Sequence, residues 1–137
     1  MTKKEIIGIV DGAIKSQIDT SVFKGDNQNK PGIGSNQFRE FANICLRAEC
    51  YEEVELQVMY NKAKDYPNDK KNPQKRGNSW DKLMLNKKDT LADIVISCMR
   101  KVRENSSEED CLKNLSLMFG YFYWNARIYA AENKNKK

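Results

Sequence analysis

Apolar residues recur every three or four positions along nearly the whole chain, and this period constrains the fold more than any other feature. Such spacing places apolar side chains on one face of an α-helix. The first predicted helix runs from about Thr2 to about Thr20, and Thr2 and Glu5 have the spacing of a capping box. Its apolar positions are Ile6, Val10, Ile14 and Ile18. No segment shows sustained period-two alternation bounded by hairpin turns. The pattern therefore predicts an all-α protein.

Several further helices are predicted downstream. Their expected starts are Ser35, about Glu52 (ending near Asp65), Ser79 (a short helix with Trp80 to Leu85), Asp89 or Thr90, and Ser106 with Glu109 as a capping box. Residues 67–78 form a predicted basic loop, and residues 133–137 form a predicted frayed tail. A chain of 137 residues is close to the usual size of one domain. We therefore expect a single compact bundle of five to six helices over residues 1–137.

Composition excludes many kinds of catalytic site. The chain has no histidine, so a Ser-His or Cys-His nucleophile pair is impossible. Its four cysteines form no Cys-x-x-Cys pair, and Cys45, Cys98 and Cys111 fall at apolar helical positions, which is typical of reduced core cysteines. No segment approaches the roughly 20 apolar residues of a membrane helix. We expect a cytoplasmic protein with no membrane partner, no bound metal and no cofactor.

The net charge of +5 comes from one stretch. Residues 67–88 carry seven basic side chains, among them Lys75, Arg76 and Lys82, against two acidic ones. Such a stretch is suited to a polyanion, because a Lys or Arg beside a phosphate releases condensed counterions. An ordinary solvated loop would have the same composition.

Three glutamates offer one catalytic alternative. Glu49, Glu52 and Glu55 are spaced by three, as in helices whose paired carboxylates bind magnesium in all-helical nucleotide pyrophosphohydrolases. Those enzymes need a second acidic pair on a facing helix, and the chain offers no clear one. A solvated helix face explains the triplet more simply.

The aromatic cluster near the C-terminus suggests a partner surface. Phe119, Phe122 and Tyr129 share one predicted helical face, which core packing explains. Tyr121 and Trp124 are predicted to lie off that face. Tyr and Trp are enriched at protein interfaces, so both are candidate partner-binding residues.

Three weak motifs follow one another along the chain, namely Gly32-Ile33-Gly34-Ser35-Asn36-Gln37-Phe38-Arg39-Glu40-Phe41, Met59-Tyr60-Asn61-Lys62-Ala63-Lys64 and Leu117-Met118-Phe119-Gly120-Tyr121-Phe122-Tyr123-Trp124. The order of these motifs resembles the small subunit of type III-A CRISPR effector complexes. Together they span roughly residues 30–131. The ending Asn125-Ala126-Arg127-Ile128-Tyr129 also resembles the related small subunit of type III-B complexes.

The resemblance implies a non-catalytic scaffold subunit. Such subunits are helical bundles that stack head to tail, as a filament of copies, along the duplex of guide and target RNA beside the other effector subunits. Carried over by motif, the expected phosphate contacts include Arg39, Lys62 and Lys64, while Gln37 is expected to reach a sugar or phosphate. Lys75, Arg76, Lys82 and Arg127 complete the candidate RNA-binding set. Lys64 stands where the family more often has arginine, and a lysine ammonium cannot make the bidentate phosphate contact of a guanidinium.

Two alternatives stay open beside this interpretation. One is the small subunit of a type III-B complex. The other is a helical protein-interaction adaptor, in which Tyr121 and Trp124 anchor a partner and the charge serves solubility.

Overall fold

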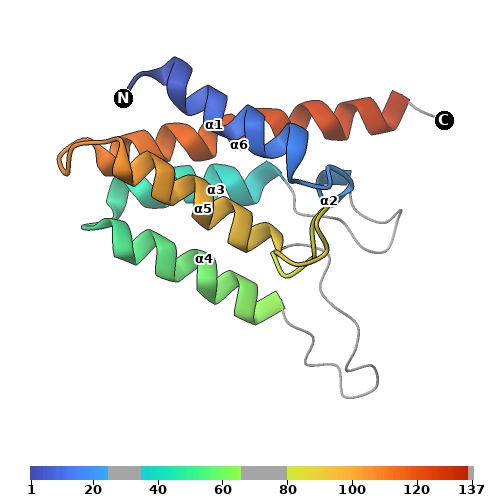
Figure 1. The fold of residues 1–137 in the computed structure, drawn as a ribbon, viewed down its shortest axis with the longest axis horizontal. Helices are drawn as coiled ribbons and strands as arrows, with labels where there is room; N and C mark the ends of the chain where they lie inside the picture. Colours follow the sequence, from blue (N-terminus) through green and yellow to red (C-terminus); the bar gives the residue numbers. More distant parts are fainter. Residues whose placement is uncertain (25–34, 66–79, 136–137) are drawn as a thin grey trace.

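The described residues fold into six helices and confirm the all-α bundle (Figure 1). The structure is a computed structural model, and it describes residues 1–24, 35–65 and 80–135. The helices are α1 (Lys3–Ser16), α2 (Ser21–Lys24), α3 (Ser35–Arg47), α4 (Tyr51–Asp65), α5 (Leu91–Glu104) and α6 (Cys111–Asn135). The basic loop expected at 67–78, with Lys75 and Arg76, lies outside the described residues. Helix α6 continues to Asn135, into the segment expected to fray.

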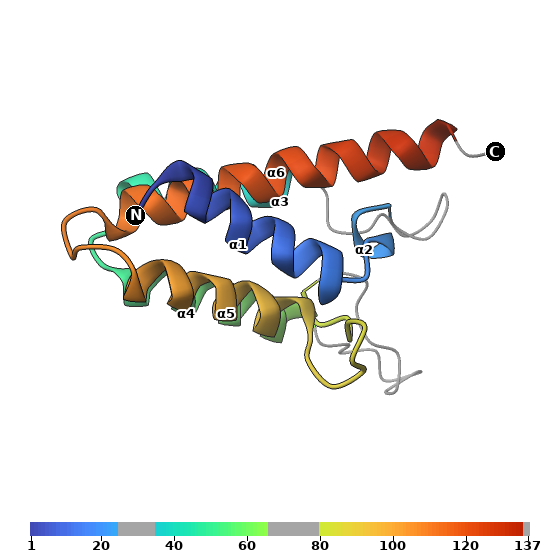
Figure 2. The ribbon, with the colours of Figure 1, turned by 45° about the horizontal axis from the view of Figure 1, so that its top comes forward.

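The five longer helices form a closed arrangement around one core. Figure 2 shows α3 and α6 together along one side, α4 and α5 together along the opposite side, and α1 between them. Packing contacts join α3 to α6, α6 to α1, α1 to α5, α5 to α4 and α4 to α3. Each long helix therefore buries one side and exposes another.

Helix α1 begins as predicted and ends earlier than predicted. Thr2 and Glu5 form the expected capping box. At the other end, the backbone N–H groups of Gln17 and Ile18 both donate to the carbonyl of Ala13, which closes the helix. The Asp19 carboxylate then accepts hydrogen bonds from the backbone and hydroxyl of Ser21 and begins α2. This local competition shortens α1.

Aromatic side chains from three segments fill the centre of the core. Phe41 stacks on Phe119 with ring centroids 5.2 Å apart, and Phe38 stacks on Phe122 at 5.3 Å. The Trp80 ring meets Phe38 and Phe41 edge-on and is almost completely buried. These contacts align α3 antiparallel to α6.

The segment from Trp80 to Thr90 is a turn, so the short helix predicted there is wrong. Leu83 pairs with Thr90 in an isolated antiparallel bridge. The Asn86 side-chain oxygen accepts from the two backbone N–H groups at positions 88 and 89, and Lys87 adopts a left-handed φ of 59°. Because the Asn86 side chain satisfies these donors locally, the turn competes successfully with a helix.

Capping was predicted correctly for α5 and incorrectly for α6. Thr90 and Asp93 form a capping box at the start of α5. Helix α6 begins at Cys111, beyond the expected Ser106 start. The Ser106 hydroxyl instead accepts a hydrogen bond from the Asn114 side chain, and the Ser107 hydroxyl accepts from the backbone of Asp110.

Candidate nucleic-acid interface

The three cations expected from the resemblance to share one surface do not meet. Arg39 is exposed on α3, whereas Lys62 and Lys64 lie on α4. The Lys62 ammonium binds the Asp93 carboxylate at 3.1 Å, on the side of α4 that faces α5. Two positions along a helix differ by about 200° in direction, so Lys64 points away from Lys62. Its ammonium lies 5.7 Å from the centre of the Tyr60 ring.

Two other candidates have structural partners. The Trp80 indole N–H donates to the Gln37 side-chain oxygen at 2.7 Å, which ties Gln37 to the core. The Lys82 ammonium donates to the Ser21 hydroxyl at 3.2 Å and so links the turn to α2.

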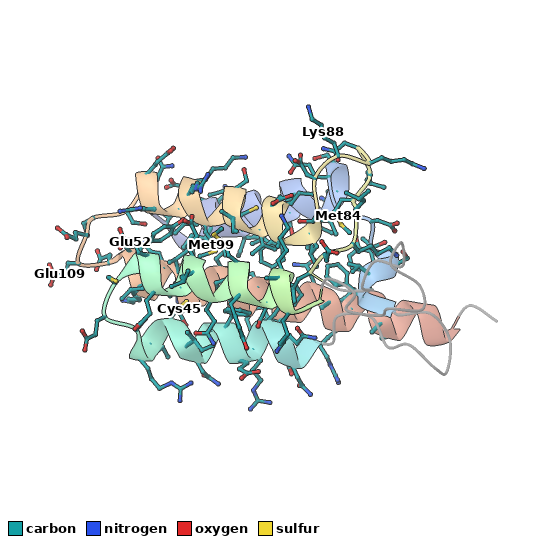
Figure 3. The ribbon with its side chains drawn as sticks, turned by 90° about the horizontal axis from the view of Figure 1, so that it is seen from below. Cys45, Glu52, Met84, Lys88, Met99 and Glu109 are labelled. Atoms are coloured by element: carbon teal, nitrogen blue, oxygen red, sulfur yellow. The ribbon has the colours of Figure 1, made fainter. Side chains whose placement is uncertain are left out.

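Between α4 and α5, three ion pairs neutralise the basic side chains. The Arg100 Nε lies 3.0 Å from a Glu55 oxygen, and an Arg103 nitrogen lies 2.6 Å from a Glu52 oxygen. The third pair is Lys62 with Asp93. We call the surface formed by these six side chains the α4–α5 face; Figure 3 shows α4 in front, between α3 and α5.

The pKa values agree with this pairing. The hydrogen bond and charge of Glu55 raise the pKa of Arg100. Partial burial opposes ionisation of Asp93, but hydrogen bonds from Thr90 and Lys62 outweigh it and lower the pKa of Asp93. Glu52 and Glu55, two of the glutamates considered for magnesium, are thus engaged with arginines.

A groove of about 1110 Å³ lies beside these ion pairs. Its lining consists of Met59, Lys62, Ala63, Asp81, Asp89, Asp93, Ile96, Ser97, Arg100, Lys101 and Glu104. Because acids and bases are mixed along it, the groove has no single sign of charge with which to attract a polyanion.

The outer side of α3 and α6 differs from the α4–α5 face, because most of its charged side chains are basic. Between Cys111 and Ala131, α6 contains two basic residues, Lys113 and Arg127, and no acid. Helix α3 contributes Arg39 and Arg47, against Glu40. All four cations are exposed, and none forms an ion pair with another described residue.

A hydrogen bond shows which sides of the two helices adjoin. The Ser116 hydroxyl donates to the carbonyl of Ala42 at 2.8 Å. Arg39 precedes Ala42 by one helical turn, and Arg127 follows Ser116 by about three turns. Both arginines therefore lie along the seam where α3 and α6 meet.

The remaining two cations lie toward the other end of the two helices. Lys113 precedes Ser116 by about one turn of α6, and Arg47 lies near the end of α3 that the antiparallel packing brings beside it. Lys113 and Arg127 are about 20 Å apart along the helix axis. We call the surface formed by Arg39, Arg47, Lys113 and Arg127 the α3–α6 face.

Trp124 adds an exposed aromatic ring beside this face. It is 62% exposed and lies one turn before Ile128, which is 55% exposed. Its ring packs at 5.6 Å from the ring of Tyr121. Tyr121 is only 8% exposed and belongs to the core, so the expectation that it lies off the core face is wrong. Helix α6 packs against both α3 and α1, and its buried side is therefore wider than one stripe.

Arg47 and Lys113 were missed by sequence reasoning. The signal was present, because Lys113 and Arg127 are the only charged residues in a run of 21 residues from Cys111 to Ala131. Reasoning from regional net charge favoured the stretch 67–88 instead.

The cysteines match the core expectation. Cys45, Cys98 and Cys111 are buried, and Cys50 is exposed. Burial raises the pKa of Cys45 to about 12 and that of Cys98 to about 11, so both thiols stay protonated at neutral pH. Among the described residues, no cluster of three His, Cys, Asp or Glu side chains has the arrangement of a metal site.

Comparison with known proteins gives no relative: no family model, curated protein or solved structure matches the chain. None of the described helices is both long and apolar enough to span a bilayer.

Proposed function

We propose that this chain is a non-catalytic RNA-binding subunit of an RNA-guided CRISPR effector complex of type III-A, and that it contacts the RNA backbone through the α3–α6 face. The observation that carries the proposal is the charge of that face, where Arg39, Arg47, Lys113 and Arg127 stand without an acidic partner among the described residues. The ordered motif resemblance of residues 30–131 supports the particular kind of complex.

The physical mechanism needs only position and charge. Each cation that approaches a phosphate releases counterions and adds sequence-independent affinity. Four cations distributed over about 20 Å match several consecutive phosphates of one strand. The guide RNA reads the target sequence by base pairing, so the protein needs no base-specific contact. Copies of this chain and other effector subunits are its expected neighbours.

The binding residues in this proposal differ from those implied by the motifs. Arg39 and Arg127 remain, while Arg47 and Lys113 join them. Lys62 is left out because Asp93 neutralises it.

The test compares RNA binding by two double variants. Arg39→Ala with Arg127→Ala is expected to lower affinity for a short RNA roughly 100-fold near 0.1 M salt, about 10-fold for each lost phosphate contact. The slope of log K against log salt should become shallower by about 1.5. Fluorescence anisotropy with labelled RNAs of several sequences measures both quantities.

Arg100→Ala with Lys101→Ala is the matched control, because it removes the same charge from α5. It should change affinity less than about 3-fold. Equal loss in the two double variants, or a wild-type affinity that does not depend on salt, would contradict the proposal.

A second experiment addresses the complex itself. RNA that co-purifies with the protein from its native cell should include a guide-sized species with repeat-derived ends. A complex whose protein partners survive nuclease and high salt, with no such RNA, would instead favour a protein-interaction adaptor. The exposed side chains of Trp124 and Ile128 are the observation that supports that second candidate.

A further inference from the structure

Helix α4 has apolar side chains on two opposite sides. Tyr51, Val54 and Val58 point into the core and are buried. Leu56 and Tyr60 are 68% and 62% exposed, on the outer side. No described helix covers this side, which faces the viewer in Figure 3. A helix in a bundle usually has a polar outer side. The exposed apolar side chains of Leu56 and Tyr60 therefore indicate a surface that another molecule covers.

The outer residues form one line along the helix. Glu53, Leu56, Tyr60 and Lys64 are spaced by three, four and four positions, the spacing of a helix-pairing seam. The cation–π contact of Lys64 with Tyr60, at 5.7 Å, holds the ammonium along that line. We call these four residues the α4 seam. Met59, 51% exposed, lies beside it.

The charges of the α4 seam complement a reversed copy of itself. An acid stands at its N-terminal end and a base at its C-terminal end, with apolar side chains between them. In an antiparallel pair, Glu53 of each copy lies opposite Lys64 of the other, and the apolar centres face each other. Antiparallel helix dipoles also attract. A parallel pair would bring like charges together.

We propose that a second copy of this chain docks on the α4 seam, helix against helix, to form a two-fold symmetric antiparallel dimer. The same patch serves both partners, as an isologous interface requires. An RNA occupant is disfavoured because the acidic Glu53 stands at one end of the seam. The α3–α6 face lies elsewhere on the bundle, so this dimer does not depend on the proposed RNA binding.

The interface is small, and the expected affinity is modest. One 15-residue helix from each copy gives a total buried area below about 1,200 Å², at the low end of specific interfaces. We expect a dissociation constant on the order of 10 μM.

Sedimentation velocity over a range of protein concentrations tests the dimer. Wild-type protein should move from monomer to dimer as concentration rises. Leu56→Glu should weaken association at least 10-fold. Leu46→Glu is the matched control, because Leu46 on α3 is 67% exposed and the same change there should leave association unaltered. Circular dichroism checks that each variant stays helical.

Charge reversal tests the antiparallel register. Glu53→Lys and Lys64→Glu should each weaken the dimer, because each places like charges opposite one another. The two changes together should restore association to within about 3-fold of wild type. A protein that stays monomeric at every concentration, a dimer insensitive to Leu56→Glu, or a double variant as weak as the single ones would overturn the proposal.

Discussion

The two charged faces of this bundle contain similar numbers of basic side chains but use them differently. On the α4–α5 face, Lys62, Arg100 and Arg103 each hold an acid on the neighbouring helix. On the α3–α6 face, the cations stand in solvent beside an exposed tryptophan. The charges of the first face form contacts within the fold, whereas the charges of the second face are exposed to solvent. Counting charges along a sequence does not separate these two uses.

The largest expected effect comes from neutralising each face completely. The α3–α6 variant changes Arg39, Arg47, Lys113 and Arg127 to Gln. The α4–α5 variant changes the three bases of that face, Lys62, Arg100 and Arg103, to Gln, together with the neighbouring Lys101, so that the two variants lose the same charge. Each variant removes four positive charges from a net charge of +5. The first should lose at least roughly 1,000-fold in RNA affinity and keep its melting temperature.

The α4–α5 variant should show the reverse pattern, with a lower melting temperature and RNA affinity within a few-fold of wild type. Anisotropy and thermal denaturation measure the two properties. If both variants lost RNA affinity equally, net charge alone would explain binding, and the distinction between the faces would fail.

Trp124 sharpens the comparison, because its exposed ring lies beside the α3–α6 face. Trp124→Ala should weaken single-stranded RNA binding by about 1–3 kcal/mol if the ring stacks on a base. Ile128→Ala, one turn away, is the control and should leave RNA affinity unchanged. Retained affinity in Trp124→Ala would favour a protein partner for this ring.

Gln37 tests whether a motif residue acts in RNA binding or in the fold. Gln37→Ala removes the hydrogen bond to the Trp80 indole and should lower the free energy of unfolding by about 1 kcal/mol. RNA affinity should not change. Gln57→Ala on the exposed side of α4 is the control, with an expected effect below about 0.5 kcal/mol. A loss of RNA affinity with unaltered stability would reverse this assignment.

The smallest expected effect is a change in folding stability at acid pH, and it comes from Asp93 on the α4–α5 face. Hydrogen bonds from Thr90 and Lys62 lower the pKa of Asp93 in the folded protein, despite partial burial. Its stabilising contribution is therefore complete above the ordinary Asp pKa of about 3.9 and is lost as pH falls through the lower folded value.

Asp93→Asn should accordingly cost about 0.5 kcal/mol at pH 7, because the pair is partly solvent-exposed. The difference from wild type should shrink below about pH 4. Urea denaturation at several pH values measures it, and a difference that stays constant down to pH 2 would contradict the assignment.

Most of the helices could be predicted from the sequence, because the spacing of apolar residues and the capping residues at helix ends are local signals. The α1 capping box at Thr2 and the α5 start at Thr90 illustrate this. The errors arose where a side chain satisfied backbone groups locally: Asn86 makes a turn after Trp80, and Asp19 ends the run that had been predicted to reach Thr20.

The candidate interface was harder to predict, because pairing between helices depends on contacts far apart in sequence. Lys62 lies 31 residues from Asp93, and no local pattern joins them. Likewise, Tyr121 is buried because α6 packs against several other helices, and this packing cannot be predicted from the sequence of α6 alone. Arg39 and Arg127 were both singled out from sequence, yet their common seam emerged only with the antiparallel packing of α3 on α6.

The indole resonances of the two tryptophans give the most direct test of the α3–α6 face. In a titration of ¹⁵N-labelled protein with a short RNA, followed by NMR, the Trp124 indole signal should shift together with the amides of Arg39 and Arg127. The signal of the buried Trp80 and the amides of Arg100 and Arg103 should stay in place. Shifts concentrated on α4 and α5, with Trp124 unmoved, would contradict the account.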